Sequence, residues 1–320
     1  MKQNTPQNVV SIGLSAAIVS VGEETPRVLA VHPQAQGADA LPFGPFDPLH
    51  HRTLESGLRA WVAEQTRLDL GYAEQLYTFG DRGRHLLKAG EELRVVSVGY
   101  LALMRAGDEL KAPDTVWRDW YRYFPWEDWR NEKPELIAAV IAPALKAFAK
   151  AGATPAESEM RRGRVRLCFG IDGPAWDEEK VLERYELLYE AGLIEEAVRD
   201  GRIPKTQTDA PLGVSMTFDH RRILATAIAR LRGKMKYRPV VFELMPPAFT
   251  LLELQRTVEA ISGIRLHKQN FRRLVEDQGL VEGTGRRAII ARGRPAELFR
   301  FRREVLSERP APGFRLRMRG

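Results

Sequence analysis

The chain has 320 residues, of which 44% are hydrophobic and 28% are charged, and this ordinary globular composition excludes an intrinsically disordered chain. Its single cysteine, Cys168, excludes an intramolecular disulfide and a cysteine cluster for structural zinc, and indicates a reducing compartment. Six scattered histidines argue against a histidine-rich metal site. No stretch of about 18 apolar residues that could span a membrane is present, so we expect a cytoplasmic protein with no membrane partner.

Charge is distributed unevenly along the chain, which has a net charge of +7. Residues 219–320 contain 23 Lys and Arg against 10 Asp and Glu, a net charge of +13, whereas the preceding 218 residues contain 26 against 32, or −6. A basic last third is therefore joined to a mildly acidic body. This asymmetry predicts a polyanionic partner for the C-terminal part, either nucleic acid or a membrane surface.

The first part of the chain has the element pattern of an α+β unit. Two β-rich runs around "GEETPR" predict a hairpin over residues 9–32, and the glycines and serines of the first run argue against a signal sequence. A helix is predicted over residues 54–68. Further strands are predicted within "EQLYTFGDRGR" and "LRVVSVGYLALMRAG".

The middle of the chain begins with an aromatic segment, residues 116–130, "VWRDWYRYFPWEDWR". Because such rings bury large areas, we interpret it as core or interdomain packing. Two stretches with helical periodicity follow, and "KTQTDAPLGVSM" has the composition of a linker. We therefore expect a first domain over residues 1–135, a helical insert and linker over 136–215, and a third domain over 216–320.

The helix predicted over residues 54–68 carries an apolar stripe and few acids. Glu55 and Glu64 are nine residues apart and lie on opposite sides of the helix, so they cannot share one divalent ion. Gln65 stands where a second adjacent carboxylate would complete a chelating pair. The stripe consists of Leu54, Leu58, Trp61, Val62 and Leu68.

Together with the Gly/Pro loop before it, this helix resembles the metal-binding motif of the Nudix family. Glu64 keeps one acid of the motif, Gln65 replaces the other, and Arg67 replaces the glycine, while Ala60 and Trp61 replace the Arg-Glu pair. In Nudix hydrolases these glutamates hold Mg²⁺, and one carboxylate is not enough for that role. The resemblance implies a Nudix fold whose pocket is retained without a metal or catalytic residues. The alternative is a chance similarity of an amphipathic helix that follows a turn.

A second segment, "LYTFGDRGRH", places two arginines beside two glycines. Arg82 and Arg84 have the planar donor geometry that suits phosphate, and Gly80 and Gly83 allow close backbone approach. The segment resembles one in bacterial Nudix-like proteins tied to NAD metabolism. With Glu64, these arginines are our candidate effector-binding residues; a solvated arginine loop is the alternative.

Three helical patterns and a hairpin are predicted in the basic last third. The first helix combines an apolar stripe with five cations. The second begins with a capping box, Thr250 to Glu253, and ends at Gly263, and the third lies in "HKQNFRRLVEDQG". Two β-like runs follow. This order predicts a winged helix-turn-helix. The cations of the first helix are Arg222, Arg230, Arg232, Lys234 and Lys236.

Residues 219–302 resemble the C-terminal domain of the Nudix-related transcriptional regulators of NAD metabolism. The resemblance implies a homodimer that binds a double-stranded DNA operator and responds to ADP-ribose or a related NAD-derived nucleotide, with no cofactor required. His267 departs from the family, which has an Asp able to cap the recognition helix at this position. By this resemblance the DNA-contacting residues are Lys268, Gln269, Asn270, Arg272 and Arg273 on the helix and Arg286 and Arg287 on the wing.

The sequence thus predicts an α+β protein: a Nudix-like αβα sandwich with a helical insert, followed by a C-terminal winged helix-turn-helix. The leading hypothesis is a ligand-responsive regulator, most simply a repressor, of NAD synthesis or salvage genes. The second is a Nudix pyrophosphatase whose missing acids come from elsewhere, namely Glu91, Glu92, Asp172 or Asp177. A structural adaptor that uses the aromatic segment is the third.

Overall fold

A computed structural model describes residues 10–32, 37–81, 94–107, 110, 112–202, 212–288 and 295–314. Its centre is a six-stranded mixed sheet in the order β4-β5-β1-β2-β6, with β3 pairing to β1. The β1–β2 pair is the predicted hairpin, and β1 and β5 are parallel. The strands are β1 (Val10–Gly22), β2 (Thr25–Val31), β3 (Phe43–Pro45), β4 (Tyr72–Phe79), β5 (Arg94–Leu103) and β6 (Thr115–Asp119).

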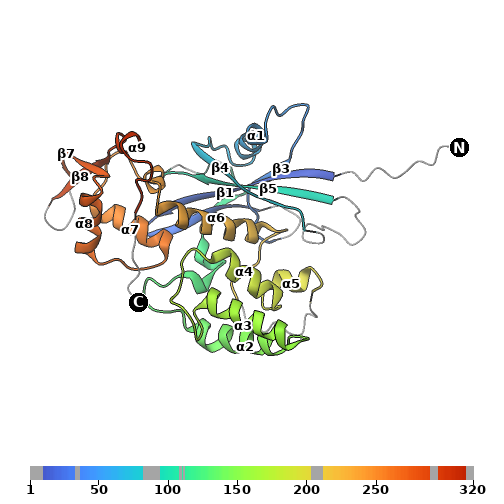
Figure 1. Ribbon diagram of the computed structural model, residues 1–320. Helices are drawn as coiled ribbons and strands as arrows, with labels where there is room; N and C mark the ends of the chain where they lie inside the picture. Colours follow the sequence, from blue (N-terminus) through green and yellow to red (C-terminus); the bar gives the residue numbers. More distant parts are fainter. Residues whose placement is uncertain are drawn as a thin grey trace.

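Both faces of this sheet are covered by helices. Side chains alternate along β1, so Leu14, Ala16 and Ile18 pack toward helix α1 (Leu54–Thr66), whereas Ala17 and Val19 belong to the core on the opposite face. That opposite face contacts helix α6 (His220–Met235). Figure 1 shows α1 on one side of the sheet and α6 on the other. The predicted αβα sandwich is confirmed.

Four helices form the insert, on the far side of α6 from the sheet (Figure 1). They follow a π-helical turn over Ile137–Ile141, and α4 packs directly on α6. Their apolar side chains belong to the same core as those of α6 and of the sheet face that α6 covers. The helical insert is therefore part of a continuous core. The helices are α2 (Ala142–Lys150), α3 (Pro155–Phe169), α4 (Val181–Glu190) and α5 (Glu195–Arg199).

The aromatic segment lies inside this core. It forms two 3₁₀ turns, η1 (Trp120–Arg122) and η2 (Pro125–Glu127), and the side chains of Trp120, Trp126 and Phe124 are fully buried. The interpretation of the aromatic residues as packing residues is therefore confirmed.

A helix-turn-helix and a wing complete the chain. The predicted capping box is present, since the Thr250 side chain accepts from the Glu253 N–H and the Glu253 carboxylate accepts from the Thr250 N–H at 2.6 Å. The elements of this part are η5 (Val240–Glu243), α7 (Leu251–Ser262), α8 (Lys268–Asp277), β7 (Val281–Ala288), β8 (Ala296–Phe301) and α9 (Val305–Glu308). An isolated antiparallel bridge joins Phe249, just before α7, to Phe299 of the two-stranded wing. The predicted winged helix is confirmed over α7, α8 and the hairpin, whereas the helix predicted as its first is α6, which also packs on the sheet and on α4.

Among the residues that the structure describes, no helix is both long and apolar enough to cross a membrane.

Candidate functional site

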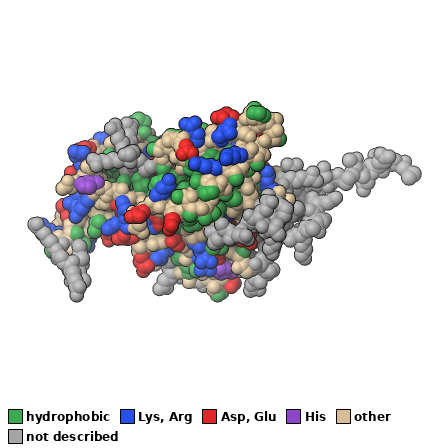
Figure 2. All heavy atoms as spheres, turned by 90° about the horizontal axis from the view of Figure 1, so that it is seen from below, with side chains coloured by type: hydrophobic (Ala, Val, Ile, Leu, Met, Phe, Trp, Pro, Cys, Tyr) green, Lys and Arg blue, Asp and Glu red, His purple; other side chains and the backbone are tan. Residues whose placement is uncertain are grey.

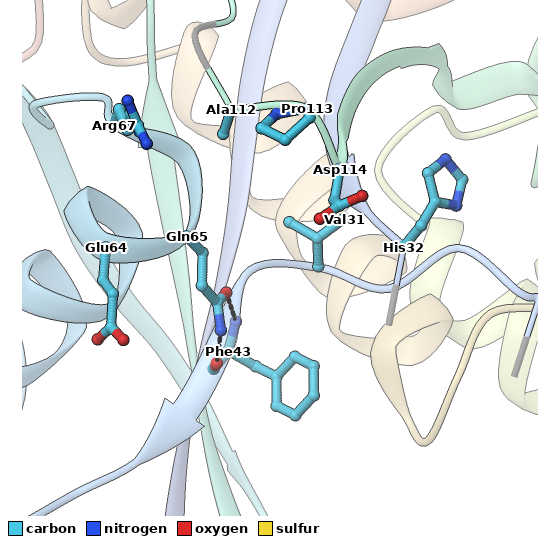
Figure 3. Close-up of a pocket in the computed structure, with 9 residues that line it drawn as sticks. All are labelled: Val31, His32, Phe43, Glu64, Gln65, Arg67, Ala112, Pro113 and Asp114. Atoms are coloured by element: carbon cyan, nitrogen blue, oxygen red, sulfur yellow. Dashed lines mark hydrogen bonds between the residues drawn. The ribbon is translucent and has the colours of Figure 1, made fainter. Parts of the chain in front are cut away.

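A cavity of about 430 Å³ opens at the C-terminal end of α1, where the Nudix-like motif ends. Strand β3 and the segment before β6 form its other walls (Figure 3). One predicted effector residue, Glu64, lines this cavity, whereas Arg82 and Arg84 lie outside the described residues. The lining residues are Val31, His32, Phe43, Glu64, Gln65, Arg67, Ala112, Pro113 and Asp114.

Gln65, which replaces a Nudix acid, fastens α1 to β3. Its side-chain Nε2 donates to the Phe43 carbonyl at 2.6 Å, and its Oε1 accepts from the Phe43 N–H at 3.0 Å. Figure 3 shows the carboxamide directed at this backbone while Glu64 points in a different direction. A carboxylate can only accept, so a Glu here would make one of these bonds and repel the carbonyl. Gln65 therefore acts as a structural clamp between α1 and β3.

Trp61, which stands where the motif has another acid, fastens the same strand. Its indole Nε1 donates to the Pro45 carbonyl at 2.7 Å. A Cβ added at Gly44 would lie 2.2 Å from the Trp61 ring, so only glycine lets the indole pack against the β3 backbone. The Gly/Pro loop and the helix therefore pack against each other. Neutral side chains, Trp61 and Gln65, stand at the positions of two motif acids.

The cavity wall that contains His32 is in contact with a buried carboxylate, Asp39. Tyr123 donates its hydroxyl to Asp39 at 2.5 Å, and His32 and Arg118 approach the same carboxylate at 3.4 and 3.3 Å. Burial, together with the hydrogen bond to Asp39, raises the pKa of Tyr123 far above its usual 10.0. Tyr123 therefore stays a neutral donor, and the wall that carries His32 is held rigidly.

Two of the acids named in the pyrophosphatase hypothesis, Asp172 and Asp177, do not line this cavity. Asp172 pairs with Lys146 at 2.9 Å in the helical insert, and Asp177 accepts from the Glu179 N–H there. Glu91 and Glu92 lie outside the described residues. Within the described part of the chain, no group of three or more His, Cys, Asp or Glu side chains is arranged to hold a metal ion.

The cavity wall is joined to the start of α6. The Leu41 N–H donates to His220 Nδ1 at 3.1 Å, and the Phe43 ring lies 5.0 Å from the His220 ring and 5.3 Å from the Phe218 ring. Phe218 has a φ of 53°, a conformation that is unfavourable for a bulky residue and is held here by its neighbours. The first turn of α6 is therefore packed directly against β3.

The five cations predicted for the helix that the structure shows as α6 with its C-cap are all ion-paired, although Arg230 is exposed. Arg232 is 1% exposed and pairs with Glu127 at 2.6 Å, Lys234 pairs with Glu74, and Lys236 pairs with Glu178 at 2.9 Å. Arg222 and Arg230 also reach carboxylates of the acidic body. The positive charge expected from these five residues is therefore offset locally by carboxylates of the preceding part of the chain. On the face drawn in Figure 2, basic and acidic side chains are accordingly interspersed.

One buried carboxylate connects the insert, α6 and the helix-turn-helix. Glu127 binds Arg184 of α4 at 2.6 Å and Arg232 of α6 at 2.6 Å, and all three side chains are at most 1% exposed. Arg232 also donates to the Ile261 carbonyl at 2.8 Å, near the end of α7. The Trp129 N–H donates to the Gly263 carbonyl at 2.7 Å. The aromatic segment is thus the joint on which the helix-turn-helix sits.

Helix α8 presents a different, unpaired set of polar residues. Phe271 and Val275 are buried against the domain, and the five predicted DNA-contacting residues of this helix are exposed. Arg286 and Arg287 on β7 are exposed as well. Within the described residues, none of these seven side chains takes part in an ion pair, unlike the cations of α6. The helix begins at His267 without a side-chain cap, as the sequence departure predicted.

Several residues around the cavity were missed by sequence reasoning. His32, Phe43 and Asp114 come from separate segments and carry no shared motif, so only the fold brings them together. Arg67 carried a signal, because it stands at a glycine position of the motif. Its position on the cavity wall was not predicted from the sequence.

Comparison with known proteins identifies the family of the C-terminal domain. Residues 241–301 match the NrtR DNA-binding winged helix domain. Over 90 residues the chain is 44% identical to the ADPR responsive transcriptional repressor NtrR of Acinetobacter baylyi. The matched segment makes up 28% of this chain and 36% of that protein. The chain thus spans about a third of the length of this curated relative.

Two solved structures share the whole fold. Shewanella oneidensis NrtR in complex with a 27mer DNA has a TM-score of 0.52 and 22% identity, with 92% of this chain and 95% of that one covered. An Enterococcus faecalis MutT/nudix family protein has a TM-score of 0.50 and 15% identity, with 94% and 90% covered. Residues 241–301 therefore form a winged-helix domain of the NrtR family, on a chain that has the Nudix and winged-helix fold of NrtR over nine-tenths of its length.

Proposed function

We propose that this protein is an ADP-ribose-responsive transcriptional repressor of genes for NAD synthesis or salvage. The observation that carries the proposal is the contrast between two sets of cations in the basic last third. Those of α6 and its C-cap are paired with carboxylates, whereas those of α8 and the wing are exposed and, within the described residues, form no ion pair. Free cations on a recognition helix are what phosphate and base contacts require. The 44% identity to an ADPR responsive repressor, together with the winged-helix match, supports the same assignment.

In the proposed complex, α8 lies in the major groove of an operator. Lys268, Gln269, Asn270, Arg272 and Arg273 contact bases and phosphates, and the wing arginines Arg286 and Arg287 contact the neighbouring backbone. Support comes from the Shewanella oneidensis NrtR, which has the same fold and was solved in complex with a 27mer DNA. A homodimer is part of the proposal, since two-fold operators match two-fold proteins.

The effector is proposed to bind in the cavity at the end of α1. A NAD-derived nucleotide such as ADP-ribose has a diphosphate and two sugars, and the cavity offers basic, acidic and aromatic walls. With Trp61 and Gln65 used for packing, the site retains a pocket without the acids for hydrolysis. Glu64 lines this pocket, and Arg82 and Arg84 remain proposed effector residues.

Communication between the two sites is proposed to run through α6. This helix of 16 residues is roughly 24 Å long, begins at the cavity wall and ends on α7. An effector that moves Phe43 changes the packing of Phe218 and His220, and Arg232 passes the shift to the carbonyl of Ile261. Such coupling requires that the effector bind one arrangement more tightly than the other.

The proposal is tested with the purified full chain in two assays. DNA affinity is measured by fluorescence anisotropy at fixed salt on its own upstream DNA and on an unrelated fragment, and site-selective binding is expected. ADP-ribose hydrolysis is measured with Mg²⁺, where no turnover above background is expected. Turnover combined with sequence-blind DNA binding would favour the pyrophosphatase hypothesis instead.

A further inference from the structure

Three helices in the described part of the chain end on a residue in the left-handed conformation. The C-cap of α3 is Gly170, with a φ of 63°, and the C-cap of α7 is Gly263, with a φ of 76°. The C-cap of α1 is Arg67, with a φ of 58° and a ψ of 25°. In all three helices the cap N–H donates to the carbonyl four residues back. The chain thus makes the same cap with glycine twice and with an arginine at α1.

Glycine is the favoured residue for this cap because a Cβ is strained in the left-handed region. Nothing in the described part of the chain offsets the strain at Arg67, since its side chain is exposed and has no ion pair or hydrogen bond there. Unfavourable backbone conformations of this kind are concentrated at functional sites. Arg67 lines the cavity of about 430 Å³, on the side opposite Asp114 and His32 (Figure 3).

The residues that line the cavity indicate a function for the Arg67 side chain. A diphosphate needs positive charge beside it, and in a metal-dependent site that charge comes from a cation held by carboxylates. Here Trp61 and Gln65 occupy the places of two acids and bind backbone groups instead. A guanidinium is always charged and binds phosphate oxygens through two parallel donors.

We propose that Arg67 is the diphosphate-binding residue of the effector cavity and makes effector binding independent of divalent metal. This inference rests on the proposed function and adds the anchor and the metal independence. It also gives a reason for an arginine at a helix cap where glycine would be more stable.

The test is calorimetric titration of the full chain with ADP-ribose and, separately, with inorganic pyrophosphate, each in EDTA and in Mg²⁺. The variants are Arg67→Gly, which suits the cap, Arg67→Lys, and Arg52→Ala as an exposed arginine outside the cavity. Wild type and Arg52→Ala are expected to bind equally in EDTA and Mg²⁺. Arg67→Gly is expected to lose about 10- to 100-fold in affinity for both ligands while its thermal midpoint stays equal or rises.

The outcomes separate this inference from the proposed function. If Arg67→Gly binds ADP-ribose as tightly as wild type, the role of Arg67 as anchor is refuted while the effector stands. If wild-type binding disappears in EDTA, the metal independence is refuted while the effector stands. If wild type binds pyrophosphate through Arg67 but not ADP-ribose, the anchor stands and the effector is wrong. If wild type binds neither ligand, both are refuted. Loss of affinity in Arg67→Lys together with Arg67→Gly supports the two-pronged guanidinium contact.

Discussion

Arg232 and Glu127 form an ion pair of 2.6 Å between side chains that are at most 1% exposed, although they are 105 residues apart in the chain. The pair joins α6 to the aromatic segment, and Arg184 completes it from the insert. Charges buried this deeply are costly unless every partner is present. The joint between the Nudix-like body and the winged helix is thus specified by charge as well as by packing.

Glu127→Ala is expected to destabilise the protein by about 3–5 kcal/mol, because it leaves two buried guanidinium groups without their carboxylate. Urea unfolding followed by circular dichroism measures the change. Glu159→Ala is the control, since Glu159 pairs with Arg162 on an exposed helix face and a loss of about 0–1 kcal/mol is expected. Equal losses of stability in the two variants would show that the buried ion pairs contribute no more than an exposed one.

Gln65→Glu restores an acid of the Nudix motif, yet a stability loss of about 1–3 kcal/mol and no hydrolase activity are expected. The new carboxylate cannot donate to the Phe43 carbonyl and faces it with a negative charge. Thermal unfolding and an ADP-ribose hydrolysis assay are the measurements. Glu64→Gln, at the neighbouring exposed position, should change stability little. Turnover in Gln65→Glu would mean that the site needs only one more acid to act as an enzyme.

We expect the stability of the helix-turn-helix to fall in acid because of Glu259. Burial alone would raise the pKa of Glu259, but hydrogen bonds from Gln255, the Leu266 N–H and Arg265 outweigh it and lower the pKa below its usual 4.5. Because the unfolded chain binds the proton more readily, the stabilisation is present above about pH 4.5 and is lost as pH falls through the folded pKa. Thermal midpoints from pH 6 to 3 should fall more steeply for wild type than for Glu259→Gln. Parallel curves would refute this role.

Arg272→Ala combined with Arg273→Ala is expected to weaken operator binding by about 10-fold or more at fixed salt and to reduce the salt dependence by about one per lost phosphate contact. Anisotropy titrations at several salt concentrations measure both effects. Lys150→Ala, an exposed lysine of the insert, is the control that removes charge far from α8. Unchanged affinity in the double variant would remove α8 from the interface.

His220→Phe keeps an aromatic ring beside Phe43 but removes the acceptor for the Leu41 N–H. ADP-ribose and DNA are each expected to bind this variant nearly as well as wild type, whereas the effect of one ligand on the affinity of the other should shrink several-fold. Paired anisotropy titrations with and without ADP-ribose give that ratio. An unchanged ratio would place the coupling outside the start of α6.

Local patterns in the sequence predicted most of the fold. The capping box at Thr250, the glycine at 263 and the apolar stripe of residues 54–68 act within a few residues, so they could be recognised without the structure. The winged helix followed from the order of three helical patterns and a hairpin in the basic last third. The pairing of Arg232 with Glu127 or of Lys234 with Glu74 could not be predicted, because each partner lies more than 100 residues away.

The candidate site was predicted less completely. Glu64 was found through a motif, but His32 and Asp114 reach the same cavity only because β2 and β6 are neighbours in the sheet. The loss of acids at Trp61 and Gln65 was visible in the sequence. Their use in fastening β3 to α1 depends on Gly44 and Phe43, about 20 residues earlier, and needed coordinates.

The most direct test of the central claim is a titration of ADP-ribose into the complex of the full chain with its own upstream DNA, followed by fluorescence anisotropy at fixed salt. We expect site-selective binding whose affinity ADP-ribose shifts by about 5-fold or more, the usual range for coupled sites. Weak, sequence-blind binding that follows salt and is unaffected by ADP-ribose would contradict an ADP-ribose-responsive repressor.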